Sequence, residues 1–312
     1  MDFVKFLAAA GFIALGVTAA RAADLTPLPP APLPPPPVEF AGTWYIRGDV
    51  GVASYSTSDW TQPVTLSPGD QVNSSGFISK SIQEPAFIDV GIGYQFLPWF
   101  RADVTAEYRT AIGLRGVFHE SIFNANASCS TDALGNPLTP CYFYGQNQYP
   151  GTLQSSLFLA NGYFDLGTWY GVTPYVGGGI GAVRHQMSGF TDSGYAWLGN
   201  ALNSNGFPNG PLSPVLNSPI ASSTRTNFAW ALMAGLSYSV TPNLKLDIGY
   251  RYMNLGNVSS GIISCLCNQV FPGFKVKELT SNEVRIGMRW IFGDFIPVAP
   301  PPVPEAPIVR KY

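Results

Sequence analysis

The sequence predicts an all-β fold, an eight-stranded antiparallel up-and-down β-barrel that spans a membrane. In the closing segment, Val284, Ile286, Met288, Trp290 and Phe292 share one parity, and two arginines and a glycine occupy the other. Side chains alternate between the faces of a strand, so this segment has one apolar and one charged face. The same division recurs along the chain, as in a barrel with lipid outside and a polar lumen.

Eight segments show this alternation, each long enough for a tilted strand to cross a bilayer. Helix-period apolar patterns are scarce, and beyond the N-terminus no apolar run has the length of a spanning helix. The predicted strands cover residues 43–55, 86–96, 100–110, 154–166, 173–184, 227–240, 244–254 and a last strand that ends at 292.

The first three strands show the pattern most clearly. The first places Trp44 outward and Asp49 inward, and in the second Ile88 alternates with Asp89. The third has five consecutive polar positions on one parity and apolar residues on the other, with aromatic residues at both ends. Those polar positions are Arg101, Asp103, Thr105, Glu107 and Arg109.

The later strands follow with less regularity. The fourth is ambiguous in parity, and placing Asn161 and Asp165 inward leaves Phe158 outside. The fifth is rich in glycine, whereas the sixth carries apolar residues at every second position from Phe228 to Val240. The inward positions of the seventh strand include Lys245, Asp247 and Arg251.

The inward parity predicts a network of charges whose signs nearly cancel. The interior of an eight-stranded barrel is just wide enough for side chains to fill, and unpaired charges there would be costly. We therefore expect these groups to pair and to close the lumen. The expected members are Arg47, Asp49, Asp89, Arg101, Asp103, Glu107, Arg109, Asp165, Lys245, Asp247, Arg251, Arg285 and Arg289.

Inward glycines are expected to leave space for two inward tyrosines, Tyr45 and Tyr175. Glycine-rich loops can also cradle a phosphate, but no helix follows these, so no nucleotide site and no cofactor is predicted. The glycines concerned are Gly91, Gly93, Gly177, Gly179 and Gly181.

The predicted links alternate in length. Those after strands two, four and six are short, and those after strands one, three, five and seven are long and rich in Ser, Asn, Gly and Pro. In outer-membrane barrels short turns face the periplasm and long loops face outside. Both termini are then periplasmic.

The N-terminus predicts the route to that membrane. Lys5 precedes an apolar run from Phe6 to Ala20, and Ala20-Arg21-Ala22 is a small-x-small cleavage pattern, so residues 1–22 read as a secretory signal peptide. The alternative, a membrane anchor, is disfavoured because the run is short. Residues 23–39 form a predicted Pro-rich periplasmic spacer, and the alternative is a docking motif for a proline-reading domain. The predicted barrel covers residues 40–292, and residues 293–312 form a predicted Pro-rich periplasmic tail.

The four cysteines lie in long loops, where an oxidising compartment permits disulfides. Cys129–Cys141 is the favoured local disulfide. A Cys265–Cys267 disulfide would close a tight, strained ring, so disulfides between the two loops remain an alternative. Neither of the two histidines has ligand spacing to a cysteine pair, so no metal site is predicted. With 17 Lys+Arg against 19 Asp+Glu, no nucleic-acid partner is expected.

Catalytic residue types meet at His119-Glu120-Ser121, in the loop after the third strand. Some small outer-membrane barrels are lipid A hydrolases with a Ser–His pair. Adjacent residues of an extended chain point to opposite faces, and no oxyanion donor is evident, so a solvated loop is favoured and no enzyme is predicted.

Several segments resemble the porin-family, "outer membrane immunogenic protein" group of eight-stranded barrels, related to the transmembrane domain of outer membrane protein A. The resemblance rests on motifs such as Trp44-Tyr45-Ile46-Arg47-Gly48-Asp49 and Gly249-Tyr250-Arg251-Tyr252 and covers about residues 40–292. It implies location in the outer membrane of a gram-negative bacterium. The closing pattern also resembles the insertion signal of such barrels, read by the barrel-insertion machinery: Arg285, Gly287, Trp290 and Phe292.

The resemblance implies a structural protein that presents surface loops, as an adhesin, a surface antigen or an envelope-integrity protein. The expected partners are outer-membrane lipid and lipopolysaccharide, the insertion machinery and an unknown extracellular ligand. The first alternative is a narrow porin-like channel for small solutes, and the second is a lipid A-modifying enzyme.

Overall fold

The computed structural model describes residues 42–264 and 270–293, and within them the backbone of 214–216 without the side chains. The described chain consists of strands joined by turns and irregular links. In these residues no helix has the length and apolar character needed to cross a membrane.

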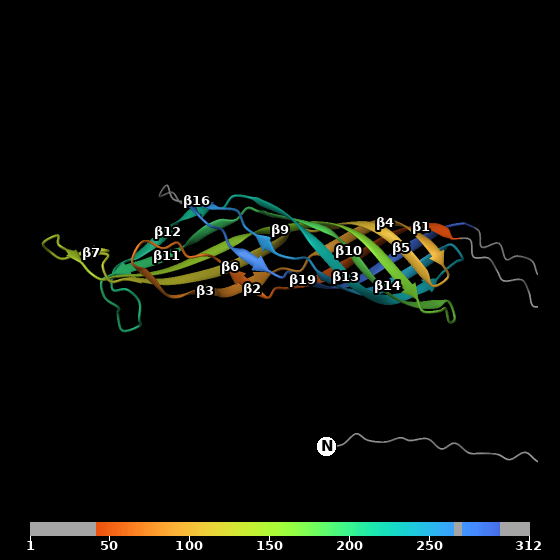
Figure 1. Ribbon diagram of the computed structural model, residues 1–312, viewed down its shortest axis with the longest axis horizontal. Coiled ribbons are helices and arrows are strands. Elements are labelled where there is room, and N and C mark those ends of the chain that lie inside the picture. The colour runs from red at the N-terminus through yellow and green to blue at the C-terminus, as the bar shows by residue number, and fades with distance from the viewer. Residues whose placement is uncertain (1–41, 265–269, 294–312) are drawn as a thin grey trace, which may run out of the picture. The chain divides into compact units, whose positions relative to one another are not determined.

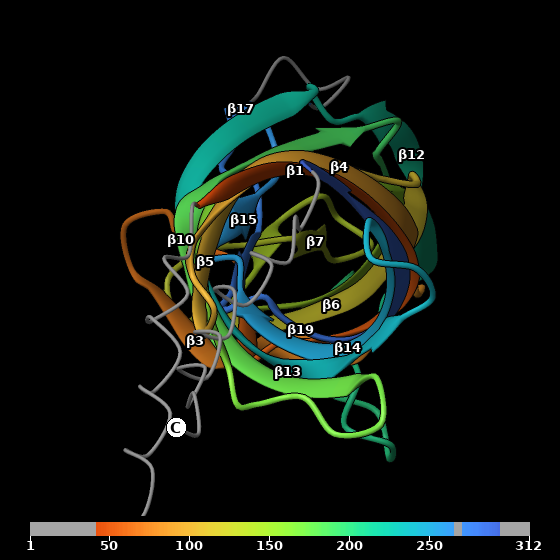
Figure 2. The same cartoon turned by 90° about the vertical axis from the view of Figure 1, so that its right-hand side faces the viewer.

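Eight strands form one closed antiparallel barrel, which confirms the predicted fold class. Figure 2 shows the ring of strands end-on. Around the ring their order is β10-β13-β14-β19-β1-β4-β5-β9, and β9 pairs with β10 to close it. The barrel strands are β1 (Thr43–Ser56), β4 (Ala86–Leu97), β5 (Phe100–Arg109), β9 (Cys141–Asp165), β10 (Val172–Ser188), β13 (Ser223–Ser239), β14 (Leu244–Asn254) and β19 (Thr280–Phe292).

The outer surface of the barrel is an apolar band. Outward side chains such as Ile92, Phe158 and Ile286 are 48%, 66% and 59% exposed, whereas most of the residues that alternate with them are buried. On β9 and β10 this band ends at Ser156 and Arg184, where the outward side chains become polar. An exposed apolar belt of this kind is stable against lipid. The predicted parity of the fourth strand is confirmed, because Asn161 and Asp165 face inward.

At one end of the barrel the strands are joined by the short turns that the sequence predicts, after β4, β9 and β13. We call this the short-turn end. The ends of the described chain also lie here, because Trp44 pairs with Phe292. The opposite, long-loop end carries the links after β1, β5, β10 and β14.

The long links contain strands that the sequence does not predict. The fourth strand begins at Cys141 and not near Gln154, and β9 runs for 25 residues because its first half pairs with strands from the links. The link strands are β3 (Asp70–Ile82), β6 (Ile112–Asn124), β11 (Thr191–Gly199) and β12 (Leu212–Pro219). β6 and β11 pair with β9, β3 pairs with β6, and β12 pairs with β11. With residues 141–153 of β9 they form what we call the extension (Figure 1).

Short strands complete the links. One small sheet joins β15 (Val258–Ser259), β18 (Lys275–Lys277) and β2 (Asp59–Thr61), and so connects the first and last links. A second joins β16 (Ile263–Ser264) and β17 (Val270–Phe271), and a third joins β7 (Ser130–Thr131) and β8 (Pro137–Leu138).

A disulfide joins Cys129 to Cys141 and encloses the β7–β8 hairpin, which confirms the favoured local bridge. Cys265 and Cys267 lie outside the described residues. So do the predicted signal peptide, spacer and C-terminal tail, apart from Gly293, and their boundaries stay predictions.

Candidate functional site

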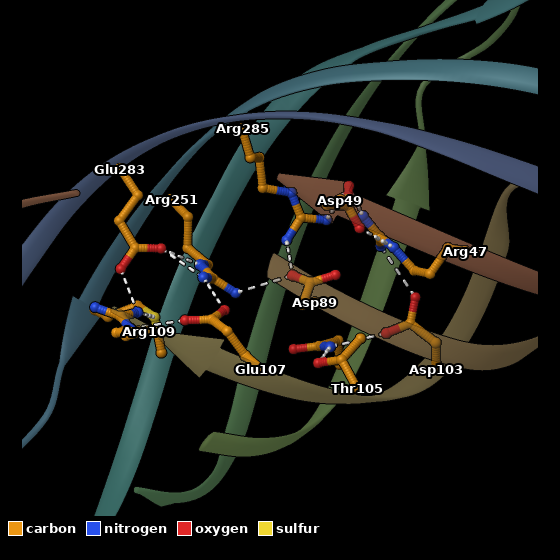
Figure 3. A network of polar contacts seen from close by, with 12 residues as sticks. Arg47, Asp49, Asp89, Asp103, Thr105, Glu107, Arg109, Arg251, Glu283 and Arg285 are labelled. Carbon is orange, nitrogen blue, oxygen red and sulfur yellow. Dashed lines mark hydrogen bonds and ion pairs between the residues drawn. The ribbon is translucent and has the colours of Figure 1, made fainter. Parts of the chain in front are cut away.

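The lumen of the barrel is filled by charged side chains that come from six of its strands. Near the long-loop end, Glu283 of β19 accepts hydrogen bonds from Arg109 Nη2 at 2.5 Å and Arg251 Nε at 2.6 Å (Figure 3). Glu107 of β5 accepts from Arg109 Nε at 2.7 Å and from Arg251 Nη2. The four side chains form a closed ring of ion pairs, and each residue is at most 4% exposed. Such charge-assisted pairs are the strongest hydrogen bonds that a protein forms.

A second group lies at mid-height in the barrel. Arg47 makes a bidentate pair with Asp49, at 2.8 and 2.7 Å, and its Nη1 donates to Asp103 at 3.1 Å (Figure 3). Arg285 Nη2 lies 3.5 Å from Asp49, and Arg285 Nη1 lies 3.9 Å from Asp89. Opposite charges thus alternate across the lumen.

A third group occupies the short-turn end. Arg101 Nε donates to Asp165 at 3.2 Å, and Arg289 Nη2 donates to Asp247 at 3.3 Å. The other two guanidinium nitrogens of Arg101 have no hydrogen-bond partner among the described residues. The Arg101 guanidinium instead lies 4.2 Å from the centroid of the Tyr163 ring, an arrangement that stabilises a cation by cation–π attraction.

The structure therefore places twelve of the thirteen charged residues named from the sequence in the lumen, each at most 7% exposed. Lys245 differs, because it is the second residue of β14, at the short-turn rim, where it is half-buried. Within the described part of the chain its ammonium makes no ion pair within 4.0 Å. Water at this rim can solvate it.

Sequence reasoning missed Glu283, which joins the ring of ion pairs described above. It lies two residues before Arg285, so it has the inward parity of the closing strand. The alternation of side chains therefore places Glu283 in the lumen, but the closing segment named from the sequence began only at Val284. With Glu283 the buried lumen holds six arginines and seven carboxylates.

Tyrosine rings fill the space that the charged side chains leave. Tyr45 is fully buried, and a Cβ placed on Gly93 would meet its ring at 2.3 Å, as expected from the sequence. Tyr175 packs elsewhere than expected: its hydroxyl faces Gly235 and Gly249, where an added Cβ would lie 2.5 and 2.6 Å away. Glycine is needed at these positions because the rings cross the narrow lumen.

Above the charge network, a cluster of aromatic rings closes the long-loop end. Phe274 is fully buried, and its ring centroid lies 5.4 to 5.9 Å from those of Trp60, Phe77, Tyr149 and Phe190. Four of these residues lie in the first, third and fourth long links, and Tyr149 lies in the part of β9 that belongs to the extension. Ring pairs at such distances stabilise each other beyond the burial of their area.

The catalytic residue types named from the sequence are not brought together. In β6, Glu120 alternates with His119 and Ser121, so it lies on the opposite face of the strand. A different pair does meet, because Ser155 Oγ lies 2.8 Å from His185 Nδ1, but both residues are at most 2% exposed. His185 Nε2 is also 3.1 Å from the Leu255 carbonyl, so both of its ring nitrogens are in use. A substrate has no access to this pair.

The four residues of the expected insertion signal all lie on β19, which pairs with β1 and β14. Trp290 and Phe292 face outward and are 47% and 49% exposed. Arg285 faces the lumen, and a Cβ placed on Gly287 would meet the Asp49 carboxylate at 2.0 Å. Their recognition during insertion stays a prediction.

A closed barrel with an apolar outer band and a charged lumen defines a transmembrane β-barrel protein. The sequence profile of the family described as "Outer membrane protein beta-barrel domain" matches residues 10–292. The chain belongs to this family, and it is an outer-membrane protein of the gram-negative type, as the sequence predicts.

The chain is also similar to several individual proteins. The chain is 33% identical over 301 residues to an uncharacterized protein of Brucella abortus, covering 88% of this chain and 94% of the relative. It is 28% identical over 203 residues to the outer membrane protein PagN of Salmonella typhimurium, covering 65% and 71%. Among solved structures, Neisserial surface protein A aligns with 80% of this chain and 99% of its own, at 17% identity and a TM-score of 0.39.

Proposed function

We propose that the protein is a structural outer-membrane barrel with a closed lumen, whose role is to present the extension at the cell surface for contact with other cells, molecules or surfaces. Short turns face the periplasm in barrels of this class, so the extension lies outside the cell. One observation carries the proposal: thirteen buried charged side chains fill the lumen in ion-paired groups. A solute would have to displace them.

The extension supports the surface role. Its strands form one continuous paired set, with β6 and β11 on β9, β3 on β6 and β12 on β11. Its interior contains buried aromatic residues, among them Phe118 and Tyr149. Folded strands of this kind hold side chains in fixed positions, which favours recognition because less conformational entropy is lost on binding. This surface can therefore carry a defined contact site.

A narrow channel is the second candidate function. It needs a continuous water path, which both the ion-paired lumen and the Phe274 cluster oppose. Lipid A modification is less favoured still, because the Ser155–His185 pair is buried and neither residue faces lipid.

The surface role is tested by replacing β11 and β12, residues 191–219, with a short Gly-Ser linker. Barrel assembly of the variant is checked from its shift in electrophoretic mobility on heating. We expect bacteria that express the variant to adhere to epithelial monolayers at least tenfold less than bacteria that express the wild type. Equal adherence of the two kinds of bacteria, at equal surface levels of the two proteins, would contradict the proposal. So would adherence of the wild-type bacteria no greater than that of cells without the protein.

A further inference from the structure

A group of polar side chains lies on the inner face of the extension, separate from the charge network of the barrel. Across β6 and β9, Phe118 pairs with Asn147 and Glu120 with Gly145; across β9 and β11, Gly194 pairs with Asn147. Since alternate residues share a face, Glu120, Asn147 and Asp192 point inward together from three neighbouring strands. Asn147 is the diagonal neighbour of both acidic residues, a spacing that longer side chains can bridge.

A fourth polar side chain reaches this group from the first long link. Gln62, which follows β2, donates a hydrogen bond from Nε2 to the Tyr149 hydroxyl at 3.0 Å. Tyr149 lies on β9, two residues after Asn147, so both side chains are on the same face of the strand.

Three oxygens of this group are buried without a hydrogen-bond partner among the described residues: Gln62 Oε1, Asn147 Oδ1 and Asp192 Oδ1. Asp192 as a whole is only 8% exposed. Buried polar atoms are nearly always satisfied by a protein group, water or an ion, because leaving them bare costs free energy. Three unsatisfied acceptors and no unsatisfied donor in one place indicate a missing positive charge or donor.

The charges of the group point the same way. Burial, and then the nearby Glu120 carboxylate, raises the pKa of Asp192 to about 7. Burial also raises the pKa of Glu120, whose Cγ lies 3.5 Å from the position of a Cβ on Gly145. No basic side chain contributes to either shift, and neither carboxylate forms an ion pair within the described part of the chain. Two acidic groups thus share this interior without a cation.

We propose that Gln62, Glu120, Asn147 and Asp192 form a binding site for a divalent cation of the Ca²⁺ type. Carboxylate and amide oxygens are hard ligands, which suit Ca²⁺ and not the softer metals that prefer imidazole or thiolate. The described residues hold no group of three or more His, Cys, Asp or Glu side chains placed to bind a metal ion, so the site depends on its two amide oxygens. A bound cation would satisfy the three bare acceptors and neutralise both carboxylates.

The site would also join parts of the extension that are distant in sequence. Gln62 belongs to the first link, Glu120 to β6, Asn147 to β9 and Asp192 to β11. Occupancy should therefore hold the first link against the sheet and protect the extension from opening. The barrel below, with its own paired charges, should be unaffected.

The test uses the full-length protein, refolded into detergent without lipopolysaccharide and stripped of metal with chelator. Calcium chloride is titrated by isothermal calorimetry, with magnesium chloride as competitor, and the resistance of the extension to proteinase K is compared in Ca²⁺ and in EDTA. We expect one Ca²⁺ bound per chain and proteolysis of the extension at least tenfold slower in Ca²⁺.

Two variants probe the ligands, and one is a matched control. Asp192→Asn removes one carboxylate, and Gln62→Leu removes one amide oxygen from a half-buried link residue; each should weaken Ca²⁺ binding at least tenfold. Glu84→Gln removes an exposed acidic charge outside the site and should bind as the wild type does. No saturable binding by the wild type, or equal affinity of Asp192→Asn and Glu84→Gln, would overturn the proposal. Protection in Ca²⁺ that persists in both site variants would do so as well.

Discussion

Removing Glu283 should destabilise the barrel more than removing any exposed carboxylate. Its side chain accepts three short hydrogen bonds, from Arg109 at 2.5 Å, Arg251 at 2.6 Å and Ser281 at 2.6 Å. In Glu283→Ala both arginines stay buried and retain only Glu107 as a carboxylate partner within hydrogen-bond distance. Breaking a buried ion pair by removing one partner costs about 3–5 kcal/mol. We expect the free energy of unfolding to fall by that amount.

The assay is reversible urea unfolding of the protein in lipid bilayers, followed by tryptophan fluorescence. Glu283→Gln keeps the size of the side chain and removes only the charge, and it should also lose about 2 kcal/mol or more because two charge-assisted hydrogen bonds are weakened. Glu84→Ala, at an exposed position, should change the free energy of unfolding by less than about 0.5 kcal/mol. If Glu283→Ala behaved like Glu84→Ala, the ring of ion pairs would not stabilise the barrel.

Three further outcomes are expected. Phe292→Ala, at the exposed end of β19, should lower the amount of assembled protein in the outer membrane severalfold at unchanged synthesis, while Phe96→Ala, also on the lipid face, should have a smaller effect; equal yields in immunoblots of unheated samples would argue against an insertion signal. Cys129→Ser should open the β7–β8 hairpin to proteinase K and leave the urea midpoint of the barrel unchanged; protection as in the wild type would show that the bridge is dispensable there. Because the folded-state pKa of Asp192 is raised to about 7 from 3.8, its contribution to stability is fully present below pH 4 and is lost as the pH rises through 7. In EDTA the extension should therefore exchange its amide hydrogens more readily at pH 8 than at pH 5, after correction for intrinsic exchange rates, and Asp192→Asn should remove most of that difference.

The alternation of side chains was sufficient to predict the barrel. Period-two patterns fix which face meets lipid, and polar or charged side chains at every second residue, as from Arg101 to Arg109, require a polar interior on the other face. The assignment could therefore be made one strand at a time, including the ambiguous parity at Asn161. The pairing partners in the lumen could not be predicted in this way. Arg109 and Glu283, for example, are 174 positions apart in the sequence.

The extension was not predicted, for a physical reason. Its strands have polar outward positions and are interrupted by bulges, as in β3 opposite β6, so neither face shows an unbroken apolar pattern. The length of β9 follows from pairing with β6 and β11, which sequence periodicity does not reveal. For the same reason Gln62, Asn147 and Asp192 gave no signal in the sequence, since they meet only through this pairing.

Closure of the lumen is tested most directly by single-channel recording of the pure protein in planar lipid bilayers. The paired charges and the Phe274 cluster predict no steady conductance steps at either polarity, for the wild type and for Phe292→Ala protein refolded in vitro. Steady steps of uniform size from the wild type, reduced or shifted by Arg101→Met or Glu107→Gln, would show an open water path and would contradict the closed barrel.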